Sequence, residues 1–500
     1  MKGCFLLQRK FAWLGHALAV ELKEKYGVSE FCGYVQSRKA ERFLRRRGDL
    51  KYTSLLVDED IWPLHKTEKL DFAYLKKLEA EYGEPNLWKF ITVDRTIMLQ
   101  IPPLEYTFRP SPLLSHEEML CLLQIRFRAT IKFLEKEKPD FLICSAVAGM
   151  SSRILYHIAK KMGIKTITIE PSRIKKFVTL SKNYLRLTGA EEIFKKLQRG
   201  ERTSPKKEEA KLFLEEFRKK PAVSTYAPAL ARFDDWNKFK FLLPQNFLKS
   251  LGWILRLSLE HLQGLHKNDY AEEAPWGILK SRIARKLRGL YGYRDLYDRP
   301  DWSEDFAYYQ LHYEPEMAML LYAPSWPDQL EVIRHIAKSL PVHFKLYVRE
   351  HRAMVNYRPR AFYKELKKIP NVKLIAPEVD LFELVEHAKL VTVITSTVGW
   401  EAALLGKPVI TFGDVFFNKL STVKKCTEIE KLPELVKAQL ENFRPNDAEI
   451  LNYLAAIFED SVEVDYFKLW EREFDFKKIK TDPGIKNLAG LVAKKLGLGA

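Results

Sequence analysis

The sequence predicts an α/β protein with two doubly wound parallel-sheet domains and a basic helical insertion between them. Two stretches of the chain alternate short apolar segments with amphipathic ones, the pattern of strands and helices in a parallel sheet. Between these stretches, cationic helical segments interrupt the alternation. We divide the 500 residues into an N-terminal domain at 1–174, an insertion at 175–300, a second α/β domain at 301–460 and a helical tail at 461–500.

The first domain begins with a strand and a helix, and its last strand leads into polar residues. Apolar segments predict strands at 4–7, 31–35, 54–57, 141–144 and 165–169. Helical periodicity predicts helices at 12–25 and 149–162. Ligands of such sheets bind beyond the carboxyl ends of the strands, so Ser145, Glu170 and Arg173 are candidates for a cleft.

The second α/β domain shows the clearest alternation. Apolar segments predict strands at 306–311, 343–348 and 372–375, from 390 to 394, and at 409–412. Helices are predicted at 328–339, 362–368, 381–387 and 398–405. The chain contains neither GxGxxG nor GxxxxGK[ST], which excludes the dinucleotide fingerprint and the P-loop.

This domain is organised around the stretch 390–412, LVTVITSTVGWEAALLGKPVITF. Thr395, Ser396 and Thr397 follow its first strand and are helix-capping residue types. Gly406 suits the position that ends the helix, and Pro408 cannot continue it. A hydroxyl cluster that leads from a strand into a helix is typical of phosphate binding, because backbone N–H groups point outward there.

Glu401 lies one turn inside the helix predicted at 398–405. With Thr397 as the capping residue, the spacing of a capping box is not met. The carboxylate is therefore predicted to bond a ribose hydroxyl. The alternative is structural: the hydroxyls only cap the helix, and Glu401 only complements its dipole.

Two further polar clusters follow strands of the second domain. Arg349 and His351, in the run Arg-Glu-His-Arg, have the charges that neutralise the phosphates of a leaving group. His312 and Glu316, in HYEPE, are predicted to contact a base or sugar. Each cluster has a structural alternative, a charged surface turn for the first and the start of a helix for the second.

Composition limits the classes of function. Five scattered cysteines form no CxxC and predict a reduced, cytoplasmic protein without a disulfide or zinc framework. No apolar run is long enough to span a bilayer, and the start of the chain does not resemble a signal peptide. Asp58-Glu59-Asp60 matches a D-x-D pattern of metal sites, but three acids before an apolar residue more often begin a helix, so we predict no metal.

The net charge of +18 implies an anionic partner: a phosphorylated substrate, a membrane surface or nucleic acid. No nucleic-acid motif is present, so we do not expect nucleic acid. Residues 237–294 carry eleven Lys and Arg against four acids. Within this range, apolar residues recur at helical spacing beside basic ones, as in helices that lie on anionic membranes. Alternatively, these apolar faces pack on the protein and the basic faces are solvated.

The second domain resembles the capsule polysaccharide biosynthesis family, which includes bacterial Kdo transferases. The similarity rests on LHYEPE at 311–316, DQL at 328–330, LYVREH at 346–351 and TSTVGWEAALLGKPVITFGDVFF at 395–417. This resemblance implies a GT-B-like fold, with two Rossmann-like domains around a cleft. It also implies that His351, Ser396 and Thr397 hold the phosphate of a nucleotide sugar. Arg352 stands where the family usually has Pro.

What the resemblance implies is a metal-independent, inverting glycosyltransferase of surface polysaccharide or glycolipid synthesis. The donor is a nucleotide sugar such as CMP-Kdo, bound as substrate, and no cofactor is expected. The acceptor is a saccharide or lipid-linked, and Glu170 is the candidate catalytic base. The expected location is cytoplasmic and peripheral on the inner membrane face. Alternatives are a polyol-phosphate transferase, an epimerase, or a non-catalytic nucleotide-binding protein of the membrane surface.

Overall fold

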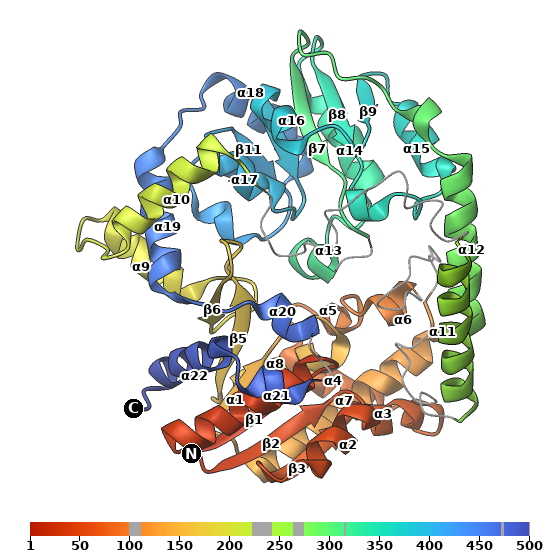
Figure 1. Cartoon of the computed structure of the whole chain (residues 1–500), viewed down its shortest axis with the longest axis vertical. Helices are drawn as coiled ribbons and strands as arrows, with labels where there is room; N and C mark the ends of the chain where they lie inside the picture. The colour runs from red at the N-terminus through yellow and green to blue at the C-terminus, as the bar shows by residue number, and fades with distance from the viewer. Residues whose placement is uncertain (100–111, 223–242, 264–274, 315–316, 472–474, 500) are drawn as a thin grey trace.

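The computed structural model of the chain describes residues 1–99, 112–222, 243–263, 275–314, 317–471 and 475–499. In this part of the chain, two lobes are each built on one sheet, and two long helices lie along one side of them (Figure 1). The α/β class and the two parallel-sheet lobes predicted from the sequence are confirmed. Glu316, a predicted site residue, lies outside the described residues.

The N-terminal sheet is mostly parallel. Its strands are β1 (Lys2–Leu7), β2 (Glu30–Val35), β3 (Tyr52–Val57), β4 (Phe141–Cys144), β5 (Lys165–Pro171), β6 (Phe177–Ser181) and β13 (Ser461–Glu463). They lie in the order β13-β6-β5-β4-β1-β2-β3, and only β6 and β13 are antiparallel to their neighbours. The central strands are apolar on both faces because helices cover both faces of the sheet.

The helices of this lobe follow the alternation predicted from the sequence. They are α1 (Phe11–Tyr26), α2 (Arg38–Arg46), α3 (Asp58–Ile61), η1 (Trp62–Lys66), α4 (Phe72–Tyr82), α5 (Trp88–Ile91), α6 (Arg95–Leu99), α7 (His116–Glu137) and α8 (Met150–Lys161). Helix α7 begins with a capping box, in which the Ser115 hydroxyl and the Glu118 carboxylate each accept a backbone N–H. In α1, every residue from Phe11 to Leu22 is buried, because other elements pack on both of its sides.

The C-terminal sheet is entirely parallel within the described residues. Its strands are β7 (Phe306–Gln310), β8 (Lys345–Arg349), β9 (Val372–Ile375), β10 (Leu390–Val393), β11 (Val409–Thr411) and β12 (Val423–Lys425). The strand order is β12-β11-β10-β7-β8-β9. Each strand therefore begins or ends within a few residues of its predicted bounds, apart from β12, which the sequence pattern did not indicate.

The helices of the C-terminal lobe cover both faces of this sheet. They are α13 (Met317–Tyr322), α14 (Gln329–Ser339), η6 (Arg352–Met354), α15 (Arg360–Lys367), α16 (Leu381–His387), α17 (Val398–Leu404), η7 (Phe416–Lys419), η8 (Ile429–Lys431), α18 (Leu432–Glu441) and α19 (Asp447–Glu459). Gly406 adopts φ 71° just past α17, which is the left-handed stop predicted for it.

The segment 175–300 does not form one insertion. Strand β6 completes the N-terminal sheet beside β5, beyond the predicted boundary at residue 174. Helices α9 (Thr188–Gln198) and α10 (Lys207–Lys219) pack on α19, where Phe194 and Leu214 share an apolar core with Tyr453. Among the described residues of this segment, α11 (Pro244–Leu262), α12 (Pro275–Tyr291) and η5 (Arg294–Leu296) remain as a basic helical segment.

The tail returns to the N-terminal lobe. Strand β13 pairs with β6, and α20 (Tyr466–Glu471), α21 (Phe476–Lys480) and α22 (Pro483–Leu496) follow it. Leu488 and Val492 of α22 are buried in the same core as Leu18 of α1. Helix α22 consequently packs beside α1, near the start of the chain (Figure 1).

None of the described helices combines the length and the apolar character that a bilayer crossing demands.

Candidate functional site

The order of the C-terminal strands creates a crevice at the end of β7. The chain runs from β7 outward through β8 and β9, and then returns to β10 on the other side of β7. Ligands of open α/β sheets bind at such a reversal, outside the carboxyl ends of the strands. The three predicted polar clusters follow the three strands that meet here, β7, β8 and β10.

His312 links the ends of β7 and β10. Its Nε2 accepts a hydrogen bond from the Ile394 backbone N–H at 3.2 Å, and its own backbone N–H donates to Gln329 Oε1 at 2.7 Å. The side chain is buried, and this burial, together with the nearby His351 and Arg358, lowers the pKa of the imidazole to about 3. A neutral ring with an accepting Nε2 carries its proton on Nδ1.

His351 follows β8 and is the second neutral imidazole of the site. Its Nδ1 accepts the Ala353 backbone N–H at 3.2 Å, so Nε2 carries the proton. Burial lowers the pKa of His351 to about 4, although the carboxylate of Glu350 opposes this effect. The ring lies 6.0 Å from the ring of Tyr313. His351 therefore offers an uncharged N–H donor at neutral pH.

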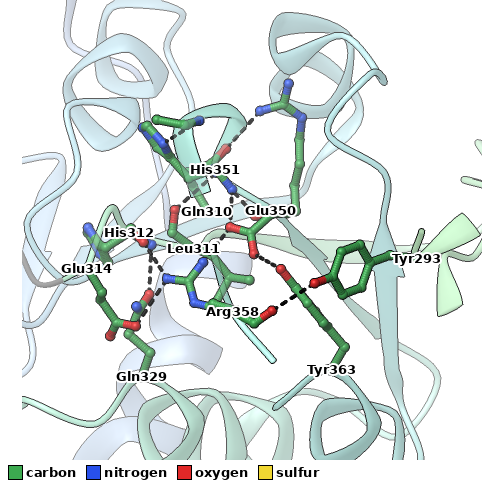
Figure 2. Close-up of polar contacts among 12 residues, drawn as sticks. Tyr293, Gln310, Leu311, His312, Glu314, Gln329, Glu350, His351, Arg358 and Tyr363 are labelled. Atoms are coloured by element: carbon green, nitrogen blue, oxygen red, sulfur yellow. Dashed lines mark hydrogen bonds and ion pairs between the residues drawn. The ribbon is translucent and has the colours of Figure 1, made fainter. Parts of the chain in front are cut away.

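A buried ion pair holds the backbone of both histidines (Figure 2). Arg358 and Glu350 are fully buried, and the guanidinium donates to the Glu350 carboxylate and to the His312 carbonyl oxygen. Glu350 also accepts the His351 backbone N–H and the Tyr363 hydroxyl, each at 2.5 Å. The pair thus positions the segments after β7 and β8 relative to each other. Neither residue is among the predicted site residues, because Glu-His-Arg and Tyr-Arg-Pro resemble surface turns.

The contacts of Arg349 differ from the phosphate contact that was predicted for it. Its side chain is 4% exposed. All three guanidinium nitrogens donate to protein oxygens: Gln310 Oε1 at 3.1 Å, the Pro377 carbonyl at 2.8 Å and the Val379 carbonyl at 3.0 Å. Arg349 therefore joins β7 and β8 to the loop after β9, and its donors are directed at the protein rather than at a phosphate.

The hydroxyl turn lies between β10 and α17. Thr395, Ser396 and Thr397 are each partly exposed. The Ser396 hydroxyl accepts the Val398 backbone N–H at 3.3 Å, whereas Thr397 stands at the capping position without a side-chain bond. The turn therefore keeps the hydroxyl hydrogens of Ser396 and Thr397 at the edge of the crevice as possible donors to a ligand.

Much of the surrounding motif serves close packing. A Cβ at Gly399 would lie 2.7 Å from Val393 Cγ2, and a Cβ at Gly413 would lie 2.6 Å from Thr395 Cγ2. Both glycines thus let neighbouring segments approach the end of β10. Trp400 is buried and packs against Phe416 and Tyr453, with ring centroids 5.2 and 6.0 Å apart. Several residues of this stretch therefore determine the packing of the lobe rather than contact a ligand.

Glu401 lies inside the lobe. Its side chain is 2% exposed, and its charge helps to raise the pKa of the buried Tyr308 hydroxyl. The carboxylate is therefore near the middle strand of the sheet. The ribose contact predicted for Glu401 stays a prediction.

The N-terminal sheet has a reversal of its own between β1 and β4. Ser145 follows β4 and donates to Gln8 Oε1, after β1, at 3.4 Å. Glu170 lies near the end of β5. Desolvation of its carboxyl raises the pKa to about 8, although the charge of the nearby Arg173 opposes this effect. No described contact joins Glu170 to His351, so the structure leaves the candidate base and the candidate phosphate donors on separate lobes.

The D-x-D pattern is structural. Arg126 donates to both carboxylate oxygens of Asp58, at 3.1 and 2.9 Å, and Tyr34 and Ser151 donate to Oδ1. This buried carboxylate therefore accepts four hydrogen bonds from the protein, three at Oδ1 and one at Oδ2. In the part of the chain that the structure describes, no three His, Cys, Asp or Glu side chains cluster as a metal site would require.

One comparison with known protein families matches part of the C-terminal lobe. The profile of a family described as "Capsule polysaccharide biosynthesis protein" matches residues 322–429, which include His351 and the hydroxyl turn. This match confirms, for the second lobe, the resemblance inferred from the sequence. No protein in the curated set matches the chain.

Several solved structures are similar to the chain at low identity. KpsC from Thermosulfurimonas dismutans, described as a β-Kdo 2,4 transferase, is 13% identical, with 64% of this chain and 80% of that one covered and a TM-score of 0.35. Its β-Kdo 2,7 transferase is also 13% identical, with 65% and 80% covered and a TM-score of 0.31. A UDP-GlcNAc 2-epimerase from Neisseria meningitidis, bound to UDP-GlcNAc, is 13% identical over both full lengths, with a TM-score of 0.28. Likeness of this size assigns neither a ligand nor a reaction to the chain.

Proposed function

We propose that this protein is a glycosyltransferase of capsule polysaccharide biosynthesis, which transfers a sugar from a nucleotide-sugar donor. The observation that carries the proposal is the pair of neutral histidines beside a hydroxyl turn at the reversal point of the C-terminal sheet. Most of this site lies in the segment that matches the family of capsule polysaccharide biosynthesis proteins.

The donor phosphate is placed at the end of β8 and β10. The Nε2–H of His351 and the hydroxyls of Ser396 and Thr397 donate hydrogen bonds to its oxygens. These donors stabilise the charge that develops on the phosphate when its bond to the anomeric carbon breaks. His312 and the Glu350–Arg358 pair position His351 and the turn, and do not contact the donor themselves.

The acceptor is placed on the N-terminal lobe. Its hydroxyl oxygen attacks the anomeric carbon from the side opposite the phosphate, which inverts the configuration, and its proton passes to a carboxylate. Glu170 is the proposed base. Because the pKa of Glu170 is about 8, its carboxyl is mostly ionised, and able to accept the proton, above about pH 8. The nucleotide sugar is a substrate, and the reaction as proposed uses no cofactor and no metal.

The donor class follows from the resemblance rather than from any contact. CMP-Kdo is the donor that the family resemblance implies, and UDP sugars are the main alternative. The proposed acceptor is a saccharide or a lipid-linked saccharide.

A thermal-shift screen tests the proposal. We expect one of CMP, UDP, GDP and CDP, or its sugar derivative, to raise the melting temperature by several degrees. His351→Ala should abolish this shift without lowering the melting temperature of the free protein by more than a few degrees, since the ring is partly exposed. His343→Ala is the matched control, because the His343 side chain is 65% exposed and remote from the crevice.

Incubation with the stabilising nucleotide sugar separates the candidate reactions. Transfer or slow hydrolysis releases the free nucleotide and supports the proposal. Conversion of the sugar with the nucleotide still attached would instead identify an epimerase. If no nucleotide shifts the melting temperature, the proposal is wrong.

A further inference from the structure

Helices α11 and α12 each carry a stripe of exposed apolar side chains. Both stripes have the same spacing, with steps of three, four, four and three residues, which places five side chains on one helix face. In α11 the five are 44–81% exposed, and they are Leu248, Leu251, Leu255, Leu259 and Leu262. In α12 the five are 44–67% exposed, and they are Trp276, Leu279, Ile283, Leu287 and Leu290.

The two helices form an antiparallel hairpin. The Arg282 guanidinium lies 3.8 Å from the centre of the Trp253 ring, and the His261 and Trp276 rings are 5.0 Å apart. Trp253 lies on the far side of α11 from the leucine stripe, since it is about half a turn away from Leu255. The hairpin therefore holds together through polar and aromatic contacts that leave the leucine stripe in solvent.

The C-terminal lobe anchors the opposite side of α12. Arg285 lies over the Tyr357 ring, 4.7 Å from its centre, and Arg288 donates to the Asn356 carbonyl oxygen at 3.0 Å. A Cβ at Gly289 would lie 3.0 Å from Asn356 Nδ2, so the helix backbone closely approaches the lobe. These contacts orient the apolar stripe of α12 away from the protein. Figure 1 shows the hairpin along one side of the molecule, beside both lobes.

The apolar stripes of α11 and α12 had two interpretations, a membrane-facing surface or a face packed on the protein. If the stripes packed on the lobes, their side chains would be buried. They are instead exposed, and apolar patches of this extent on a protein surface mark an interaction site.

The charge around the stripes indicates the partner. The two helices contain seven Lys and Arg and a single acid, Glu260. Lys249, Arg256, Lys280 and Lys286 each adjoin a stripe residue in sequence, which puts them about 100° around the helix, at the edge of a stripe. Two such cationic hairpins repel each other, which disfavours a second copy of the chain. Anionic lipid matches both the apolar stripe and its basic edges.

We propose that the α11–α12 hairpin docks the protein on a membrane surface that contains anionic lipid. The stripes insert between the headgroups, with Trp276 at the level of the interface, and the flanking lysines and arginines contact lipid phosphates. The inference does not rest on the transfer reaction, because docking requires no nucleotide. It would place the crevices of both lobes beside a lipid-linked acceptor.

Vesicle flotation tests the docking of the full chain. We expect it to float with vesicles of phosphatidylcholine and phosphatidylglycerol, and to bind pure phosphatidylcholine at least about tenfold more weakly. Added salt should weaken the binding. The double variant Leu255→Glu/Ile283→Glu should lose at least about tenfold in partitioning, because it puts two charges into the stripes. Leu212→Glu, at a residue of α10 that is 59% exposed, should bind as the wild type does.

A charge-reversal pair tests the basic edges. Lys280→Glu/Lys286→Glu should reduce binding to the anionic vesicles by about tenfold or more, since each cation near the surface contributes to attraction. Lys207→Glu/Lys211→Glu, at two exposed positions of α10, is the control for net charge. The melting temperatures of all variants, measured alongside, establish that they fold.

Three outcomes would overturn the inference. The first is that the wild type binds neither kind of vesicle, and the second is that it binds both equally. The third is that the wild type is a dimer in solution that Leu255→Glu dissociates, which would show that a second copy covers the stripe. His351→Ala should still float with anionic vesicles, so failure of the proposed transferase function would not be confused with failure of docking.

Discussion

At the scale of single residues, the site depends on charges that the protein keeps out of water. Glu350 and Arg358 are both fully buried and hold the backbone after β7 and β8. His312 and His351 are kept neutral by the same burial. The sequence pattern could predict that polar residues follow these strands. It could not predict which of them face a ligand. The directions of the Arg349 and His351 side chains depend on how the chain turns between these residues, and the sequence pattern does not give this turn.

Replacement of Glu350 tests the importance of the buried pair. Glu350→Gln removes the charge that compensates Arg358, and we expect it to lower the free energy of unfolding by about 3–5 kcal/mol. Chemical denaturation measures this change. Glu441→Gln, at the exposed end of α18, should stay within about 0.5 kcal/mol of the wild type. Equal effects of the two substitutions would contradict a positioning role for the pair.

The carboxyl of Glu170 predicts a pH-dependent stability. Its pKa is about 8 in the folded protein, against an ordinary value of 4.5, so between these values the unfolded chain loses a proton that the folded chain retains. Glu170 therefore destabilises the fold progressively as pH rises from about 4.5 to 8. Glu170→Gln lacks this titration, and its melting temperature should match the wild type near pH 4.5 and exceed it above pH 8. Parallel curves for the two proteins would refute the prediction.

At the scale of elements, the sequence predicted most strands and helices of both sheets. A continuous apolar run such as that of β4 has a strong local signal, because the strand is buried on both faces. Strand β6 was missed because it is antiparallel and follows two lysines in a charged region. Strand β13 has three residues and, among the described residues, pairs only with β6, so it is defined by a tertiary contact rather than by its own composition.

The close contact of α17 with β10 predicts the effect of a methyl group. Gly399→Ala should lower the free energy of unfolding by about 1–3 kcal/mol, because the new Cβ would lie 2.7 Å from Val393. Gly252→Ala in α11 is the control. No atom lies within 4 Å of its Cβ position, so the substitution should be neutral or stabilise by up to about 1 kcal/mol. Thermal and chemical denaturation of both variants check these signs.

At the scale of the whole molecule, Asp460 contacts segments that belong to both lobes. Its carboxylate accepts the Thr179 hydroxyl of β6 at 2.9 Å and pairs with Lys495 of α22. A Cβ at Gly189 would collide with the same carboxylate, so α9 also packs directly against it. One residue therefore joins the N-terminal sheet, the returning tail and the helices of the C-terminal lobe. Such long-range contacts leave no signature in a local sequence pattern.

The returning tail should be essential to the first lobe. Leu488→Ala removes a side chain that is fully buried against α1, and we expect it to lower the free energy of unfolding by about 2–5 kcal/mol. Leu212→Ala, at an exposed position of α10, should change it by less than about 0.5 kcal/mol. A small effect of Leu488→Ala would show that α22 is only loosely attached.

The return of α22 also sets the order in which the protein can be completed during synthesis. Domains generally fold from the N-terminus as they leave the ribosome. Here the lobe that is made first lacks its edge strand and the cover of α1 until the last forty residues emerge. The apolar face of α1 therefore stays exposed throughout translation of the second lobe. The first-made half of this protein is the last to finish folding.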